Sequence, residues 1–318
     1  MIWVFMAKRC LRALVTAWFG VTLIFFAIRA IPGDAAEALL GTQTTAAGLQ
    51  TLRHQMGLDQ PLLVQYGVML SRLAHGDLGR SLVVGQPIRQ MIVEVAPYTG
   101  LLVASALLIG AALGIPLGIA AARFRNGLVD NMTRVFSLGG LVIPDFVMGV
   151  LLMIPFCVWL GWFPLVGGGR LGDWPSLLRA TVLPAMAGGL GMAAYMTRIS
   201  RSAVLDLLRE DFVRTANAKG LAPRTVLFKH VLRNALIPIV TFLGFYGIIM
   251  LGDSIAIEIV FSRPGFGRLI LGGIEQRDYN LLQSVLVIYV LAAAVINLVV
   301  DMLYTAIDPR LRLDGGTS

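Results

Sequence analysis

The residues able to do chemistry are sparse in this sequence, and their spacing does not form a catalytic set. The histidines are His54, His75 and His230, and no metal-site spacing links them to one another or to Cys10 and Cys157. The sequence shows no Ser/His/Asp set, HExxH motif or paired-carboxylate arrangement of the kind that a membrane enzyme needs. We therefore expect no catalytic residue, no metal and no cofactor, in a chain that is not itself an enzyme.

The lysines argue against a nucleotide site in this chain. A Walker A loop needs Gly-Lys followed by Ser or Thr, so that backbone amides and the lysine hold the phosphates. None of Lys8, Lys219 and Lys229 follows a glycine or precedes a serine or threonine. If the protein's work is driven by ATP, a partner must bring the nucleotide site.

Three aspartates, Asp145, Asp253 and Asp301, lie in or beside long apolar runs. An aspartate in the middle of a membrane helix costs about 3 kcal/mol on insertion scales. Such residues are usually retained for function, so Asp145 should face protein or water. Asp145 and Asp253 are candidates to line a translocation pathway, and the alternative for Asp145 is a structural polar contact. A buried acid also leaves open a proton-coupled secondary transporter.

The apolar segments that must position these residues dominate the composition. Of the 318 residues, 57% are hydrophobic and 14% are charged, whereas roughly a quarter of a soluble domain is charged. Because a crossing helix needs about 20 mostly apolar residues, we predict an all-α polytopic membrane protein. Its six transmembrane helices lie at approximately 11–29, 98–122, 135–162, 179–199, 235–257 and 281–305.

The first apolar run has a cleaved signal peptide as its alternative interpretation. Signal-peptide cores are typically about 7–15 residues long. The run at 13–28 is longer, and no clean A-x-A site precedes Arg29. A retained first helix is therefore the favoured interpretation.

The placement of basic residues predicts the orientation. With six spans, sixteen Lys and Arg residues fall on the side of the termini, and ten are spread over the longer segments of the other side. The positive-inside rule then puts both termini in the cytoplasm. The net charge of +8 is explained by topology, and no nucleic-acid partner is required.

These spans divide the chain into four parts: 1–29, an extracytoplasmic segment 30–97, a transmembrane domain 98–307 and a cytoplasmic tail 308–318. The extracytoplasmic segment should be helical. Thr44 or Thr45 can cap a helix that stops at Gly57, and Pro61 can begin another that ends at Gly76. This segment is interpreted as a cap packed on the bundle, or as a docking surface for a soluble partner.

The sequence of the cytoplasmic loop 200–234 predicts a helix, a glycine turn and a second helix. Asp211 suits the helix N-cap, Gly220 suits the C′ position where positive φ costs little, and Pro223 suits the first turn of the next helix. In the second helix, Leu221, Phe228, Leu232 and Leu236 are expected to face the bundle. An ordinary basic loop is the alternative interpretation.

This loop resembles the EAA loop of ABC importer permeases, which reads Glu-Ala-Ala, three residues, Gly, nine residues and Ile-x-Leu-Pro. Arg214-Thr215-Ala216 stands at Glu-Ala-Ala, and Gly220 and Leu232 match. The family's Glu, Ile and Pro are replaced, and such replacements are usual in its peptide/nickel branch. Further stretches resemble that branch: Ile31-Pro32-Gly33-Asp34, Gly57-Leu58-Asp59-Gln60-Pro61, Gly76-Asp77-Leu78-Gly79-Arg80-Ser81, Ile143-Pro144-Asp145-Phe146, Glu258–Arg268 and Asp308-Pro309-Arg310.

The resemblance covers nearly the whole chain and is to the first, B-type permease of dipeptide and oligopeptide importers. It implies six helices of the type I importer architecture in the bacterial inner membrane. It also implies a second permease, giving a heterodimer, together with two cytoplasmic ATPase subunits and an extracytoplasmic solute-binding protein. The expected ATPase contacts are Asp211, Phe212, Arg214, Thr215, Ala216, Lys219 and Gly220. Di- or oligopeptides are the expected cargo, with nickel chelates or glutathione-like peptides as alternatives.

Overall fold

The computed structural model describes residues 2–30, 46–55 and 57–307, and helices dominate all three ranges. Extended pairing among these residues is limited to an isolated bridge between Arg80 and Pro87. The predicted all-α class is therefore confirmed. The motif at 31–34, the proposed caps Thr44 and Thr45, and Asp308-Pro309-Arg310 lie outside the described residues.

Five helical stretches are long and apolar enough to cross a membrane, and a sixth crossing results if one bent pair of helices counts as a span. Each of the five contains the span that the sequence predicts there and extends beyond it. In particular, the second long helix begins at Ile88, ten residues before the predicted start of its span at 98. The long helices are α1 (Ile2–Ala30), α5 (Ile88–Arg123), α8 (Trp174–Leu207), α11 (Leu232–Val260) and α13 (Tyr279–Ile307).

The third apolar segment is not the continuous helix predicted for 135–162. It consists of α6 (Leu128–Val142), followed by α7 (Asp145–Met153) with η1 (Ile154–Trp159). The helix direction bends by 104° between these two parts. Pro144 explains the bend, because a residue before proline is pushed into extended backbone. Ile143 has φ −88° and ψ 118°, and α6 ends there. Asp145 therefore begins a new helix rather than lying part-way along a single one.

Glycines bring α5 and α8 into close contact at the centre of the bundle. A Cβ added to Gly110 would lie 2.5 Å from Met192 Sδ, and one at Gly114 would lie 2.7 Å from the Ala193 carbonyl oxygen. The predicted close packing of 188–191 is also seen, since a Cβ at Gly189 would lie 2.8 Å from Ile109. Small residues allow membrane helices to approach in this way.

A second packed region joins α1, α13, α12 (Phe266–Glu275) and the start of α5. Its buried side chains include Ile28, Ile88, Phe266, Ile270 and Val285. The predicted helices of the segment between the first two spans are present as α3 (Ala46–Gln55) and α4 (Leu62–Ala74). As predicted, Gly57 and Gly76 follow them with positive φ of 67° and 71°.

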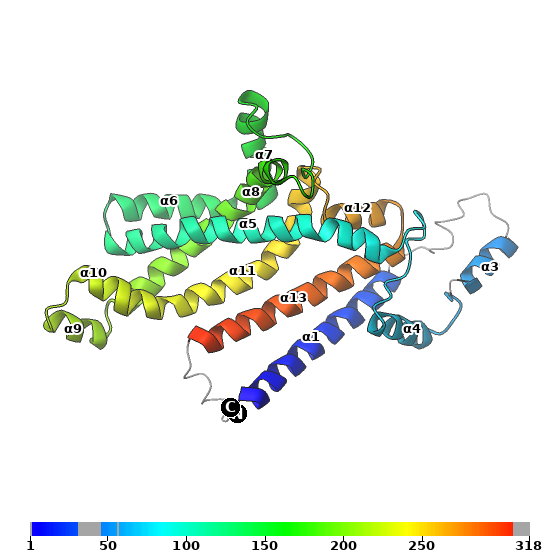
Figure 1. The fold of residues 1–318 in the computed structure, drawn as a ribbon, viewed down its shortest axis with the longest axis horizontal. Coiled ribbons are helices and arrows are strands. Elements are labelled where there is room, and N and C mark those ends of the chain that lie inside the picture. Colours follow the sequence, from blue (N-terminus) through cyan, green and yellow to red (C-terminus); the bar gives the residue numbers. More distant parts are fainter. Residues whose placement is uncertain (1, 31–45, 56, 308–318) are drawn as a thin grey trace.

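The bundle has two distinguishable ends (Figure 1). The short helix α9 (Asp211–Ala218), the beginning of α1 and the last turns of α13 lie toward one end, which we call the α9 end. Helices α3, α4 and α12 lie toward the other, the α12 end, while α7 projects away from the bundle. The elements predicted to act in the cytoplasm thus share one end.

Candidate functional site

The helix α9 presents two different faces. Val213 and Ala216 are buried in the main core, whereas Asp211, Phe212, Arg214, Thr215 and Lys219 are exposed. Arg214 Nη1 lies 3.3 Å from Asp211 Oδ1, and both side chains are largely in solvent. Of the residues expected to contact an ATPase, Ala216 therefore seats the helix against its own bundle. The exposed residues form an outward face that a partner can reach.

The beginning of α9 differs in detail from the sequence expectation. Asp211 is the first helical residue, and Glu210 occupies the N-cap position with no side-chain cap hydrogen bond. An acidic residue in the first turn still interacts favourably with the helix dipole. The predicted start is therefore displaced by one residue.

Gly220 ends α9 in the predicted left-handed conformation, with φ 75°. Its N–H donates to the Asn217 carbonyl at 2.9 Å, and the Leu221 N–H donates to the Ala216 carbonyl at 3.3 Å. This pair of bonds is the Schellman arrangement of a helix C-terminus. The turn then leads directly to Pro223, the first residue of α10 (Pro223–Thr225).

The helix after the turn faces the bundle differently from the prediction. Val226, Leu227, Val231 and Ala235 are buried, and Leu232 is partly buried. The predicted inward residues Leu221, Phe228 and Leu236 are instead 38%, 61% and 38% exposed. The buried residues Leu227, Val231 and Ala235 repeat every four residues, so the helix turns toward the bundle the face one residue before the predicted one. A π-helical segment, η2 (Val226–Val231), lies at the start of this stretch.

A buried carboxylate that sequence reasoning missed joins α6 to α8 near the α9 end. Asp130 is fully buried and accepts from Arg201 Nε at 2.6 Å and Nη2 at 2.9 Å. Arg134 Nη2 and the Asn126 N–H complete its partners at 3.0 and 2.9 Å. The i,i+4 spacing of Asp130 and Arg134 is the signal that the sequence offered. These bonds hold α6 against α8, the helix that precedes the α9 loop.

The two aspartates predicted to line a pathway lie in the same cavity. Asp145 at the start of α7 and Asp253 on α11 both line a cavity of about 380 Å³. Asp145 Oδ2 is buried and has no hydrogen-bond partner among the described residues. The described residues that line the cavity include no lysine, arginine or histidine. Asp301, the third aspartate singled out from the sequence, instead pairs with Arg9 and joins α13 to α1.

Aromatic rings form the rest of this cavity, and sequence reasoning missed them. Tyr195, Phe242 and Tyr246 have ring centroids 5.6 to 6.0 Å apart, and Phe245 adjoins Phe242 at 6.4 Å. Tyr195 comes from α8 and the others come from α11, where residues 242, 245 and 246 share one helical face. The combination of negative carboxylates and aromatic faces suits a cationic group.

A buried polar junction at the α12 end holds four helices together. Glu258 accepts from Thr99 Oγ1 at 2.5 Å and from the Gly267 N–H at 2.7 Å. Arg263 donates to the carbonyl oxygens of Ala180 and Tyr98 at 3.0 and 3.4 Å. Burial lowers the pKa of Arg263, an effect that the nearby Glu258 opposes. The motif at 258–268 signalled this junction, although no function was predicted for it.

The comparisons with known proteins agree over nearly the whole chain. Residues 114–313 match the family described as "Binding-protein-dependent transport system inner membrane component", and residues 1–100 match the N-terminal membrane component of such systems. The glutathione transport system permease protein GsiC of Pectobacterium atrosepticum is 39% identical over 305 residues, which are 96% of this chain and 97% of that protein. GsiC of Escherichia coli K12 is 37% identical over 308 residues, covering 97% and 98%.

A solved structure shares the fold. The inward-facing methionine ABC transporter MetNI matches with a TM-score of 0.57 and 21% identity. The match covers 70% of this chain and 99% of the MetNI chain. The predicted type I importer permease architecture is thereby confirmed as a fold.

Proposed function

Because the chain belongs to the family of binding-protein-dependent transport system inner membrane components, we propose that it is one of two unlike permease subunits in an ATP-driven importer of short peptides. It is a multi-pass inner membrane protein and an ABC importer permease, without enzymatic activity of its own. The observation that carries the proposal is the family match together with an exposed helix and turn at 211–220.

The complete importer contains a second permease, two cytoplasmic ATPases and an extracytoplasmic binding protein. Both termini and α9 lie in the cytoplasm. The excess of basic residues on that side supports this orientation, as does the common position of α9, the start of α1 and the end of α13 (Figure 1). In the complete assembly, the binding protein delivers cargo at the α12 end.

The outward face of α9 is the contact with an ATPase. Phe212 offers an apolar side chain, and Arg214 and Lys219 offer positive charge to acidic groups or helix C-termini. Val213 and Ala216 transmit the movement, because they pack into the core that joins α5, α8 and α11. Closure of the ATPase dimer thereby moves α9 as a lever and switches the bundle between inward- and outward-open states.

The cargo is a short peptide with a free amino group, and glutathione-like peptides are included. The two GsiC relatives support this class by their names. The cavity with Asp145 and Asp253 lies on the pathway, where carboxylates and aromatic rings meet the ammonium group of the passing peptide. The names of these two relatives give no support to nickel chelates, which remain the alternative cargo.

Changing both aspartates to asparagine tests this pathway. A hydrogen bond to a charged group is worth about 1.5–3 kcal/mol, so Asp145→Asn with Asp253→Asn should slow uptake of a dipeptide about tenfold or more. ATP hydrolysis stimulated by the binding protein should persist, because α9 is untouched. Asp206→Asn is the matched control, since Asp206 is an exposed acid of α8 outside the cavity. Equal uptake by the unchanged protein, the double variant and the Asp206→Asn control would show that the cavity does not lie on the pathway.

Reconstitution tests the assembly itself. Proteoliposomes should take up a labelled dipeptide only when this chain, the second permease, the ATPases and the binding protein are all present with ATP inside. Omitting any one of them should reduce uptake to the level of empty vesicles. Accumulation by this chain alone under a proton gradient would instead establish a secondary transporter.

A further inference from the structure

A second and larger cavity lies at the α12 end, away from the proposed pathway. Its volume is about 800 Å³, and its walls come from α1, α3, α4, the loop after α4 and the start of α13. Three arginines line it, namely Arg29, Arg53 and Arg72, together with His54. Among the described residues of the lining, Asp77 is acidic. Arg29 and Arg72 therefore supply positive charge to this cavity.

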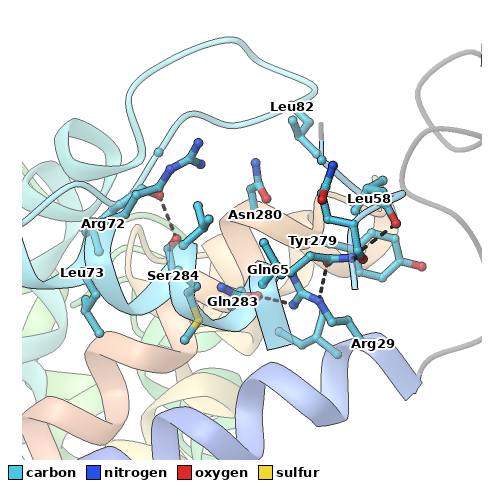
Figure 2. Close-up of a pocket in the computed structure, with 18 of the residues that line it drawn as sticks. Arg29, Leu58, Gln65, Arg72, Leu73, Leu82, Tyr279, Asn280, Gln283 and Ser284 are labelled. Carbon is cyan, nitrogen blue, oxygen red and sulfur yellow. Dashed lines mark hydrogen bonds between the residues drawn. The ribbon is translucent and has the colours of Figure 1, made fainter. Parts of the chain in front are cut away.

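Arg29 lies at the base of this cavity and is held by uncharged groups. Its Nε donates to Gln65 Oε1 at 3.1 Å, and its Nη1 donates to Gln283 Oε1 at 2.9 Å. Figure 2 shows Arg29 of α1 between Gln65 of α4 and Gln283 of α13. The guanidinium carbon also lies 3.6 Å from the ring centroid of Phe25. These contacts fix the guanidinium without neutralising it.

The charge of Arg29 is not balanced within the described part of the chain. Neither Arg29 nor Arg72 forms an ion pair among those residues. Asp77 accepts the Gly79 N–H at 2.8 Å, and Asp59 pairs with His54 at 2.6 Å, which raises the pKa of His54. A half-buried cation fixed by neutral oxygens favours an anion supplied from outside.

The position of the cavity identifies the source of that anion. Arg29 is in the last turn of a helix that is long and apolar enough to cross a membrane. The end of such a helix falls where the lipid headgroups begin. Tyr66 of α4 hydrogen-bonds Thr22 at 2.6 Å, two turns further into the span, so α4 lies at the membrane boundary. Leu62, Leu63 and Val68 of α4 are 51%, 76% and 47% exposed. An exposed apolar helix at that depth lies in the interface of a bilayer.

We propose that this cavity binds the phosphate headgroup of an anionic phospholipid, with Arg29 and Arg72 as its charged contacts. Apolar side chains share the lining with the arginines, among them Leu62, Val68 and Leu82. A phospholipid brings both chemistries, because its phosphate meets the guanidinium groups while its glycerol and acyl carbons cover the apolar wall. A free phosphate would leave that wall uncovered. The bound lipid joins α1, α4 and α13.

Lipid retention by the purified importer, with its partner subunits, tests the proposal. Native mass spectrometry should show phosphatidylglycerol retained in preference to phosphatidylcholine. Arg72→Gln should weaken retention about tenfold, since a charge-assisted contact is lost. Arg29→Gln should weaken retention of phosphatidylglycerol by the same factor or by a larger one. Arg89→Gln is the matched control, because Arg89 is exposed near the same end but does not line the cavity.

Three outcomes would overturn the proposal. One is equal retention of phosphatidylglycerol by the unchanged protein and the Arg72→Gln variant, which decides the matter even if Arg29→Gln does not assemble. Another is displacement of the lipid by inorganic phosphate at equal concentration, which would identify a free-anion site. The third is an Arg72→Gln variant that retains its lipid but whose ATP hydrolysis is no longer stimulated by the binding protein. This result would identify an acidic protein surface as the ligand.

Discussion

Replacing Gly220 with leucine should reduce uptake about tenfold or more while the importer still assembles in the membrane. A side chain at φ 75° costs about 1–2 kcal/mol, and 1.4 kcal/mol corresponds to a factor of ten in an equilibrium. Relaxing the strain breaks the bonds from Gly220 and Leu221 to the end of α9. Helix α9 then points away from its ATPase, so hydrolysis continues without transport. ATP hydrolysis and peptide uptake should be measured together in proteoliposomes.

The same position supplies its own control. Asparagine tolerates the left-handed conformation far better than leucine does, so Gly220→Asn should keep most of the uptake. Apart from its two chain neighbours, no described residue has an atom within 4 Å of a Cβ at Gly220, so an added Cβ meets no steric clash there. Normal uptake by Gly220→Leu, or equal loss in both variants, would show that the backbone conformation of this turn does not set coupling.

The turns of this protein could be predicted because their causes are local. Gly57, Pro61, Gly76, Gly220 and Pro223 end or begin helices as expected. Each effect depends on one residue's allowed dihedrals and missing or present N–H. The apolar runs likewise fix which segments form long helices, since about 20 such residues suffice to span a bilayer.

The structure differs from the prediction in two helical segments. The bend before Pro144 divides the third apolar segment, although the proline was visible in the sequence. Other prolines, such as Pro116 and Pro184, remain inside continuous helices, so a proline alone does not decide the outcome. The helix after the Gly220 turn buries Leu227, Val231 and Ala235, each one residue before a predicted position, and Phe228 is therefore exposed. A helical period fixes the spacing of a buried face but not its phase, and apolar residues stand at both sets of positions here.

The cavity on the candidate pathway could not be predicted from the sequence, because it depends on tertiary packing. Asp145 and Asp253 are 108 positions apart, and their common cavity depends on the bend of α6 and α7 against α11. Each aspartate was notable by itself, because a carboxylate is costly in an apolar segment. Tyr195 and Phe242 were not notable, because aromatic residues are ordinary in membrane helices. Their contribution became visible only through tertiary packing.

The junction of Glu258 and Arg263 should carry the largest single contribution to stability. Both side chains are 0% exposed. Replacing Arg263 with methionine leaves the carbonyl oxygens of Ala180 and Tyr98 without their donor and removes the positive charge near Glu258. Breaking a buried charged network in this way costs about 3–5 kcal/mol. We expect Arg263→Met to lower the unfolding midpoint of the purified importer sharply and to reduce its amount in the membrane.

Two comparisons separate this effect from a general loss of arginine. Arg170→Met should change stability by less than about 0.5 kcal/mol, because Arg170 is exposed. Adding Glu258→Gln to Arg263→Met should recover part of the loss, since the double variant no longer buries a carboxylate without its counterpart. The glutamine oxygen can still accept from Thr99 or the Gly267 N–H. If Arg263→Met unfolds at the same midpoint as the unchanged protein, the four helices are held by apolar packing alone, and the buried charges serve another purpose.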